Sequence, residues 1–167
     1  MIFVTVGTHE QPFNRLLQSI DDLISSGVIK EEVIAQTGYC TYIPQNFKHQ
    51  KFFPYDQMIT NVKKARLTIT HGGPSSFIMP LQFGKIPVVM PRQFKFGEHV
   101  NDHQLTFCQE VANQQHNIIL VENDEELKTA IIEYKDISAK MQNSITSNNK
   151  VFNEDLEKMV QSLFPKK

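Results

Sequence analysis

Residues 66–76, Arg-Leu-Thr-Ile-Thr-His-Gly-Gly-Pro-Ser-Ser, decide how this chain folds and where its chemistry is expected. The apolar, β-branched start predicts a buried strand, and Pro74 suits the first turn of a helix that continues to about Phe83. A glycine-rich turn from a strand into a helix exposes backbone N–H groups and the positive end of the helix dipole to an anion. We therefore expect a phosphate group at His71, Gly72, Gly73, Ser75 and Ser76. The alternative is a tight turn needed only for packing, with His71 as a buried structural residue.

A second polar segment follows the next predicted strand, Ile86 to Met90. Within seven positions it contains Glu98, His99, Asn101, Asp102, His103 and Gln104. Several amides and no cysteines favour hydrogen bonds to sugar hydroxyls over a zinc site. The alternative is a solvated start of the helix predicted from Leu105 to Gln115, and Asp102 is the residue that we most expect to act only as a helix cap.

The remaining sequence alternates between predicted strands and predicted helices. Strands are expected at residues 1–6, 32–37, 51–53 and 117–122, and helices from Pro12 to Ser25, from Tyr55 to Ala65 and from Asp124 onward. This alternation predicts an α/β fold with a mainly parallel sheet, helices on both faces, and ligand contacts at the carboxyl ends of the strands.

Three segments of different composition are expected along the chain. Residues 1–137 form one ligand-binding domain, residues 138–150 form a polar linker or weak helix, and residues 151–167 form an amphipathic helix. The apolar stripe of that last helix either folds back on the domain or docks on a partner.

Bulk properties exclude several classes of protein. The 167 residues fit one domain, and a net charge of -1 gives no general reason to bind nucleic acid. Two cysteines without metal-ligand spacing predict a reduced, cytosolic protein, and no signal peptide or membrane span is recognisable. The glycine turn matches neither the P-loop nor the dinucleotide fingerprint, which disfavours kinases and dehydrogenases.

A set of motifs in fixed order resembles a known family. The set comprises Phe3-Val4-Thr5-Val6-Gly7-Thr8, Met58, Ala65, residues 70–76, Gly84-Lys85-Ile86-Pro87-Val88-Val89 and His103-Gln104. It resembles the Rossmann-like, donor-binding C-terminal half of GT-B glycosyltransferases of the family-28 type. Within that family it is similar to stand-alone subunits, namely the soluble subunit of the dolichol-linked N-acetylglucosaminyltransferase and bacterial capsule or exopolysaccharide counterparts. The run from Gly97 to Gln104 is most similar to the bacterial branch.

The resemblance implies a UDP-sugar donor, no tightly bound cofactor and no required metal. It assigns the donor diphosphate to Gly7, Thr8, His71, Gly72, Gly73, Ser75 and Ser76. It assigns contacts with the donor sugar to His103 and Gln104, within the polar segment 98–104. It assigns contacts with the base to Phe53 and Tyr55, which would serve equally well as core residues. One departure is Met79, where the family often has a glutamate that binds the ribose hydroxyls; Glu98 is a possible substitute.

The resemblance also implies a second polypeptide. A membrane-anchored subunit would bind the lipid-diphosphate-linked acceptor and hold this chain at the inner face of the plasma membrane. His9 or Glu10 could assist as a general base, or could be exposed interface residues. The expected function is inverting transfer of a hexose, galactose by best guess, in surface polysaccharide biosynthesis. The alternatives are a non-catalytic nucleotide-sugar-binding module that regulates a partner transferase, and a UDP-sugar epimerase.

Overall fold

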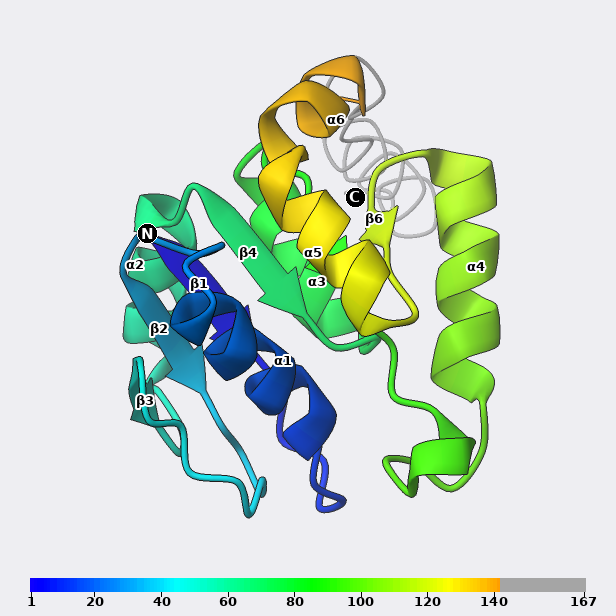
Figure 1. Cartoon of the computed structure of the whole chain (residues 1–167). Helices are drawn as coiled ribbons and strands as arrows, with labels where there is room; N and C mark the ends of the chain where they lie inside the picture. The colour runs from blue at the N-terminus through cyan, green and yellow to red at the C-terminus, as the bar shows by residue number, and fades with distance from the viewer. Residues whose placement is uncertain (142–167) are drawn as a thin grey trace, which may run out of the picture.

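The computed structural model describes residues 1–141 and contains one six-stranded sheet (Figure 1). Every pair of neighbouring strands is parallel, and the strand order is β3-β2-β1-β4-β5-β6. The strands are β1 (Ile2–Thr5), β2 (Val33–Gln36), β3 (Lys48–Gln50), β4 (Leu67–Thr70), β5 (Val88–Val89) and β6 (Ile119–Leu120). Successive strands therefore extend outward from β1 first in one direction and then in the other, as in a doubly wound fold.

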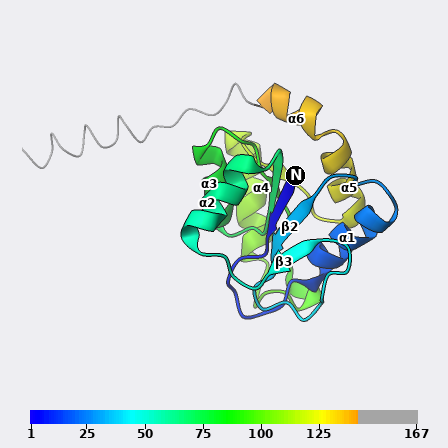
Figure 2. The same ribbon diagram turned by 90° about the vertical axis from the view of Figure 1, so that its left-hand side faces the viewer.

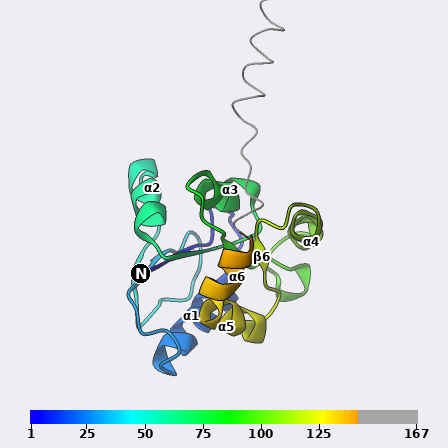
Figure 3. The same cartoon turned by 90° about the horizontal axis from the view of Figure 1, so that it is seen from above.

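Helices cover both faces of the sheet, which confirms the predicted α/β, Rossmann-like fold class. Figures 2 and 3 show α1 (Asn14–Ser25), α5 (Asp124–Ile132) and α6 (Tyr134–Met141) on one face. The other face carries α2 (Tyr55–Lys64), α3 (Pro74–Gln82) and α4 (His103–Gln115). A short 3-10 helix, η1 (Phe94–Phe96), lies in the segment between β5 and α4.

The apolar side chains of β1 alternate between the two faces. Ile2 and Val4 join the large core beneath α1 and α5, whereas Phe3 packs with Val62 of α2 in a smaller cluster on the opposite side. Ile2, Phe3 and Val4 are all fully buried. A central parallel strand covered on both faces has to be apolar throughout, which explains the continuous apolar sequence at the start of the chain.

The predicted strand at 51–53 is wrong in position, because the third strand occupies residues 48–50. This strand lies at the edge of the sheet with all three side chains exposed, and its residues Lys48 to Gln50 pair with residues 34–36 of β2. Backbone pairing needs no apolar pattern, so an exposed edge strand of polar residues gives little signal in the sequence. Phe53 instead packs against Phe3 across 6.1 Å between ring centroids.

Other boundaries differ from the prediction by a few residues. The first helix begins at Asn14, so Pro12 precedes it, and α4 begins at His103, two residues before the predicted start. Residues 138–141 belong to α6, although a linker or weak helix was expected there. The rest of the predicted linker and the whole predicted helix 151–167 lie outside the described residues. Among residues 1–141, no helix has the length and apolar character needed to cross a membrane.

Candidate functional site

The site lies where the strand order reverses, at the carboxyl ends of β1 and β4. These two strands pair along their length, with Thr5 opposite Thr70. Gly7-Thr8 follows β1 and leads to α1 on one face of the sheet, whereas His71-Gly72-Gly73 follows β4 and leads to α3 on the other face. Ligands of doubly wound folds bind in the crevice that such a reversal opens. Two of the segments predicted to contact phosphate are therefore neighbours in space.

A cavity of about 750 Å³ opens at this edge, between the segment after β1 and helices α2 and α3. Its polar wall is formed by Thr5, Gly7, Thr8, His9, Glu10, Gln36, His71, Ser75 and Ser76. Its apolar wall is formed by Phe53, Tyr55, Met58, Val62 and Met79. The cavity thus combines a polar end at the start of α3 with an apolar end between α2 and α3, and its volume suits a ligand of nucleotide size.

The ring of His71 lies between two glycines. Gly7 has a φ of +76°, and a Cβ atom added there would collide with the His71 ring. A Cβ atom added at Gly73 would collide with the same ring from another direction. Both positions therefore require glycine because the imidazole occupies the space that a side chain would take.

Hydrogen bonds define the protonation of His71. The backbone N–H of Gly73 donates to Nδ1 at 3.1 Å, so the proton of the neutral ring is on Nε2, which donates to Ser76 Oγ at 3.0 Å. Burial is the largest cause and the nearby charge of Arg92 the second, and together they lower the pKa of His71 to about 4. At neutral pH His71 is thus an uncharged hydrogen-bond donor next to the N-terminus of α3 (Pro74–Gln82).

A row of polar side chains crosses the carboxyl ends of β2, β1 and β4 beneath the cavity. Gln36, Thr5 and Thr70 are aligned by the strand register and are all buried. Gln36 Nε2 donates to Thr5 Oγ1 at 3.3 Å, and Gln36 Oε1 accepts from the backbone N–H of Phe53 at 3.0 Å. Thr5 and Gln36 were not among the site residues predicted from the sequence. A polar residue at the end of an otherwise apolar strand was the available signal.

A smaller pocket of about 200 Å³ lies on the other side of the glycine turn. It is lined by Gly72, Gly73, Pro74, His99, His103, Gln104 and Phe107. Gln104 is held by the backbone N–H of Arg92, which donates to its Oε1 at 3.3 Å. The turn at Gly72 and Gly73 therefore separates a large cavity from a small pocket, and the predicted sugar-contacting residues His99, His103 and Gln104 line the small one.

The other members of the predicted sugar-binding segment bond within the loop. Asn101 Oδ1 accepts from the backbone N–H of His103 at 3.0 Å, and Asp102 Oδ1 accepts from the backbone N–H of Phe94 at 2.8 Å. The side chain that binds the first turn of α4 is therefore that of Asn101. Asp102 occupies the N-cap position without a side-chain capping bond, so its expected role as a mere cap is corrected.

Glu98 has a structural place that the sequence did not suggest. Its side chain is 4% exposed, and its two carboxylate oxygens each accept from Arg15 at 2.9 Å. The Oε2 atom also accepts from the backbone N–H of Gln93 at 3.0 Å. A bidentate, buried ion pair uses the carboxylate internally. This corrects the expectation that Glu98 contacts the sugar or replaces a ribose-binding glutamate.

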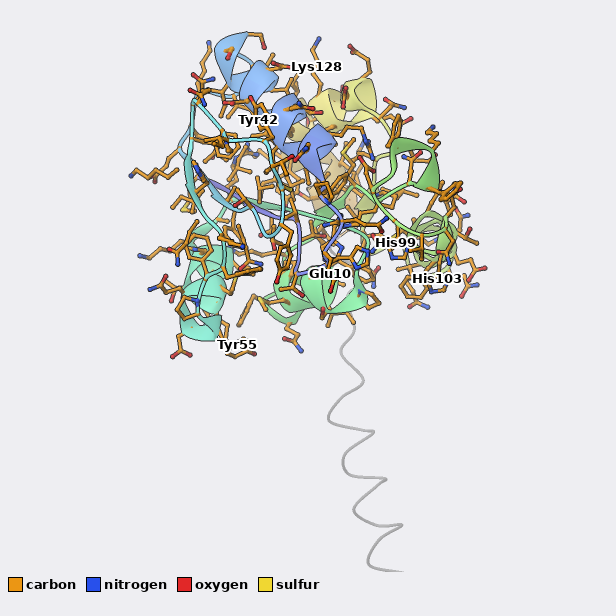
Figure 4. The ribbon with its side chains drawn as sticks, turned by 90° about the horizontal axis from the view of Figure 1, so that it is seen from below. Glu10, Tyr42, Tyr55, His99, His103 and Lys128 are labelled. Atoms are coloured by element: carbon orange, nitrogen blue, oxygen red, sulfur yellow. The ribbon has the colours of Figure 1, made fainter. Side chains whose placement is uncertain are left out.

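His9 and Glu10 occupy the loop after β1. The rings of His9 and His99 are stacked with centroids 4.8 Å apart, which joins this loop to the loop before α4. Figure 4 shows Glu10 beside His99 near the middle of the carboxyl face, with Tyr55 well to one side and His103 to the other. Burial and the neighbouring His9 lower the pKa of His99. Glu10 is exposed and is the carboxylate among the residues that line the large cavity.

The two predicted base-contacting aromatics also meet the large cavity, but differently. Phe53 is half-buried against Phe3, whereas Tyr55 is 68% exposed at the start of α2. Met79 lies one turn beyond Ser75 on α3 and forms part of the apolar wall. In the part of the chain that the structure describes, no three histidine, cysteine, aspartate or glutamate side chains gather closely enough to hold a metal ion.

Comparison with known proteins identifies a matching family model, described as the glycosyltransferase family 28 C-terminal domain, over residues 1–163. A search of curated proteins finds no match.

Solved structures share the fold at low sequence identity. The glycosyltransferase of kitacinnamycin has a TM-score of 0.58 at 15% identity, with 86% of this chain and 38% of that chain covered. Spinosyn forosaminyltransferase SpnP has a TM-score of 0.59 at 13% identity, with 95% and 43% covered. Glycosyltransferase VinC, solved in complex with dTDP, has a TM-score of 0.53 at 14% identity, with 93% and 40% covered. The present chain therefore spans about two fifths of each of these proteins.

The buried, uncharged state of His71 predicts a pH-dependent stability. Because its pKa is about 4 in the folded protein and 6.5 ordinarily, the unfolded chain binds the proton more tightly, and acidification below about pH 6.5 destabilises the fold. From pH 7 to pH 5 this residue should remove about 2 kcal/mol from the free energy of unfolding, measured by urea denaturation. His71→Gln should lose that part of the dependence, whereas His49→Gln, on the exposed edge strand, should retain it. If the unfolding free energy of the two variants depended equally on pH, the effect could not be assigned to His71.

The close approach of Gly7 to the His71 ring predicts that two glycine-to-alanine substitutions differ in their effect on stability. Gly7 and Gly27 both have positive φ, but an added Cβ meets His71 at Gly7 and open space at Gly27. Gly27→Ala should cost about 1 kcal/mol of unfolding free energy from backbone strain. Gly7→Ala should cost about 2 kcal/mol more, because the ring is blocked on its other side by Gly73. Similar losses in urea denaturation for the two variants would show that the ring is free to move.

Proposed function

Because this chain belongs to the glycosyltransferase family 28 C-terminal domain family, we propose that it binds the nucleotide-sugar donor of a glycosyl transfer reaction. The proposed reaction moves a hexose, with galactose as the first candidate, from UDP to a sugar on a lipid-diphosphate carrier in bacterial surface-polysaccharide biosynthesis. The similarity of the run from Gly97 to Gln104 to bacterial polysaccharide transferases supports this choice of pathway.

One observation carries the proposal: a neutral His71 donor and the N-terminus of α3 face the polar end of a nucleotide-sized cavity. Helix N-termini attract phosphate through the dipole and the free N–H groups of the first turn. The hydroxyl groups of Ser75 and Ser76 lie on the same turn and line the same wall. The diphosphate is therefore proposed to lie across Gly7, Thr8 and the start of α3.

The apolar end of the cavity suits the nucleoside. Met79 lies four residues after Ser75, about 6 Å further along α3, and lines the same cavity. Phe53, Met58 and Val62 complete that wall and can cover the base. A thymidine diphosphate is bound in the solved VinC complex. A pyrimidine nucleoside diphosphate is accordingly the proposed ligand here.

The donor sugar is proposed to enter the small pocket beyond the glycine turn. His99, His103 and Gln104 line that pocket and can donate and accept hydrogen bonds to hydroxyl groups. Asn101 and Asp102 stabilise the loop that carries these residues and are not proposed as direct sugar contacts. A diphosphate at Gly72 and Gly73 would join a nucleoside on one side of the turn to a sugar on the other.

The proposed chemistry is an inverting displacement. The acceptor hydroxyl attacks the anomeric carbon, the bond from that carbon to the diphosphate oxygen breaks, and the nucleoside diphosphate leaves with the electron pair. The N-terminus of α3 stabilises the charge on the departing oxygen, and His71 acts through the Ser76 hydroxyl, which accepts its Nε2 proton and can donate its own to that oxygen, without a metal ion in this scheme. Glu10, exposed at the cavity wall, is the candidate in this chain to accept the proton of the hydroxyl, and His9 is the second candidate.

A second polypeptide is proposed to bind the acceptor. This chain spans about two fifths of the solved transferases that share its fold, and the proposed second polypeptide corresponds to the part of those proteins that this chain does not cover. Exposed large apolar side chains follow the carboxyl ends of three strands: Tyr39, Tyr55, Phe94, Phe96 and Val100. Such a rim supports docking of a protein partner. The partner is proposed to be membrane-anchored, which would place this chain at the cytoplasmic face.

A binding panel tests the donor assignment. UDP, dTDP, UDP-galactose, UDP-N-acetylglucosamine, UDP-glucuronate and GDP-mannose are compared by thermal shift and calorimetry. We expect a uridine or thymidine diphosphate to bind. His71→Ala should weaken that binding at least about tenfold, because a hydrogen bond to a charged group is lost. His49→Ala should not. Stabilisation by GDP-mannose alone would contradict the pyrimidine assignment.

Transfer activity separates a catalytic subunit from a module that only binds the donor. With the partner present, His71→Ala and Gln104→Ala should each reduce transfer at least about tenfold, and Gln114→Ala, on the exposed side of α4, should not. Full activity of the His71 and Gln104 variants would favour the non-catalytic module. Epimerisation of a UDP-sugar by the purified chain alone would favour an epimerase.

A further inference from the structure

Arg92 is a fully buried cation behind the candidate site. It follows β5 at the carboxyl edge of the sheet and is the largest of the fully buried side chains among the described residues, with an exposed fraction of 0%. An arginine remains charged in proteins, and a buried charge is costly unless it is compensated. The environment of Arg92 therefore needs an explanation.

Backbone carbonyls hold the guanidinium. Nη1 donates to Gln11 O at 2.6 Å and to Glu98 O at 3.2 Å, and Nη2 donates to Val6 O at 2.8 Å. The guanidinium carbon also lies 5.0 Å from the centre of the Phe13 ring. Each carbonyl belongs to a segment of the site: Val6 precedes Gly7, Gln11 lies in the loop of His9 and Glu10, and Glu98 precedes His99.

Within the described residues, no carboxylate forms an ion pair with Arg92. Across residues 1–141, no ion pair includes Arg92, because the carboxylate of Glu98 binds Arg15 and the backbone N–H of Gln93. The Nε atom of Arg92 is buried without a hydrogen-bond partner. Carbonyl oxygens bring only partial charges, and the Glu98 carboxylate, which is itself paired with Arg15, acts on Arg92 through space without an ion-pair contact.

The field of Arg92 reaches both sides of the glycine turn. The positive charge of Arg92 is the second-largest cause, after burial, of the lowered pKa of His71. It also contributes to the lowered pKa of His99. The backbone N–H of Arg92 binds the side chain of Gln104 in the small pocket. His71 lines the large cavity and His99 the small pocket, so the charge acts where the diphosphate is proposed to bind.

We propose that Arg92 is an electrostatic positioning residue, a fixed positive charge behind the phosphate-binding turn that strengthens binding of a nucleoside diphosphate without touching it. The proposal rests on the proposed donor-binding function. A charge held by three carbonyls needs no reorganisation when the ligand arrives, and its action in a water-poor interior is weakly screened. The same charge stabilises the diphosphate as it leaves. This function explains why the protein retains a costly buried cation.

A purely structural function would be different. In that case Arg92 would only tie three loops together, and its removal would weaken binding of every ligand of the cavity alike. An electrostatic function predicts that binding of a charged ligand suffers far more than binding of its neutral counterpart. Uridine and UDP form this pair, since they share the nucleoside and differ in the diphosphate.

The test compares Arg92→Met, Arg92→Lys and Arg66→Met by calorimetry with uridine, UDP and dTDP. Arg92→Met removes the charge and should weaken diphosphate binding at least about tenfold while changing uridine binding less than about twofold. Arg92→Lys keeps the charge and should retain the wild-type ratio of UDP to uridine affinity. Arg66→Met removes an equal charge from a half-exposed site before β4 and should leave both affinities unchanged. Equal losses for UDP and uridine in Arg92→Met, or no loss, would overturn the proposal.

A measurement without ligand separates this proposal from the proposed function. NMR titration of His71 should give a higher pKa in Arg92→Met than in the wild type, still below 6.5 because burial persists. An unchanged His71 pKa would overturn the proposal even if UDP binds. Failure of the wild type to bind any nucleoside diphosphate would instead refute the donor-binding function. If Arg92→Met does not fold, a fall in the UDP-to-uridine ratio of Arg92→Lys would still refute the electrostatic function.

Discussion

The parallel pairing of β1 with β4 is the constraint on which the rest of this structure depends. It aligns Thr5 with Thr70 and so places the segments after both strands side by side. The His71 ring then fits only because Gly7 and Gly73, which lie in different segments, both lack a side chain. Chain topology, glycine placement and the protonation of one imidazole are therefore parts of one arrangement, and a change in any of them would alter the other two.

Buried charged side chains connect the loops at the carboxyl edge of the sheet. Arg15 and Glu98 form a bidentate ion pair that connects α1 to the loop after β5. Arg92 binds the carbonyls of three segments and forms no ion pair with any carboxylate of residues 1–141. The two arginines hold the loops that line both cavities. Loops held in this way can present hydrogen-bond donors and a fixed potential to a ligand with little reorganisation, which suits the recognition of a diphosphate.

Much of the site was predictable because its residues stand in local patterns. A strand, two glycines, a proline and two serines in sequence specify an exposed helix N-terminus, and a dense polar run after the next strand marks a second loop at the same edge. Long-range partners were not predictable in this way. Arg15 and Glu98 are 83 residues apart, and the sequence contains no local sign that the carboxylate is buried rather than presented to a sugar.

The sequence alone determined the fold class, the order of its main elements and the place of the glycine turn before α3, because apolar periodicity and glycine and proline chemistry act over a few residues. The tertiary structure decided the rest. It showed that His71 is buried and uncharged, that Asn101 and not Asp102 binds the start of α4, and that Arg92 is a cation enclosed by carbonyl groups. Burial, protonation and the division of the edge into a large cavity and a small pocket depend on which distant segments pack together. No local pattern encodes that packing.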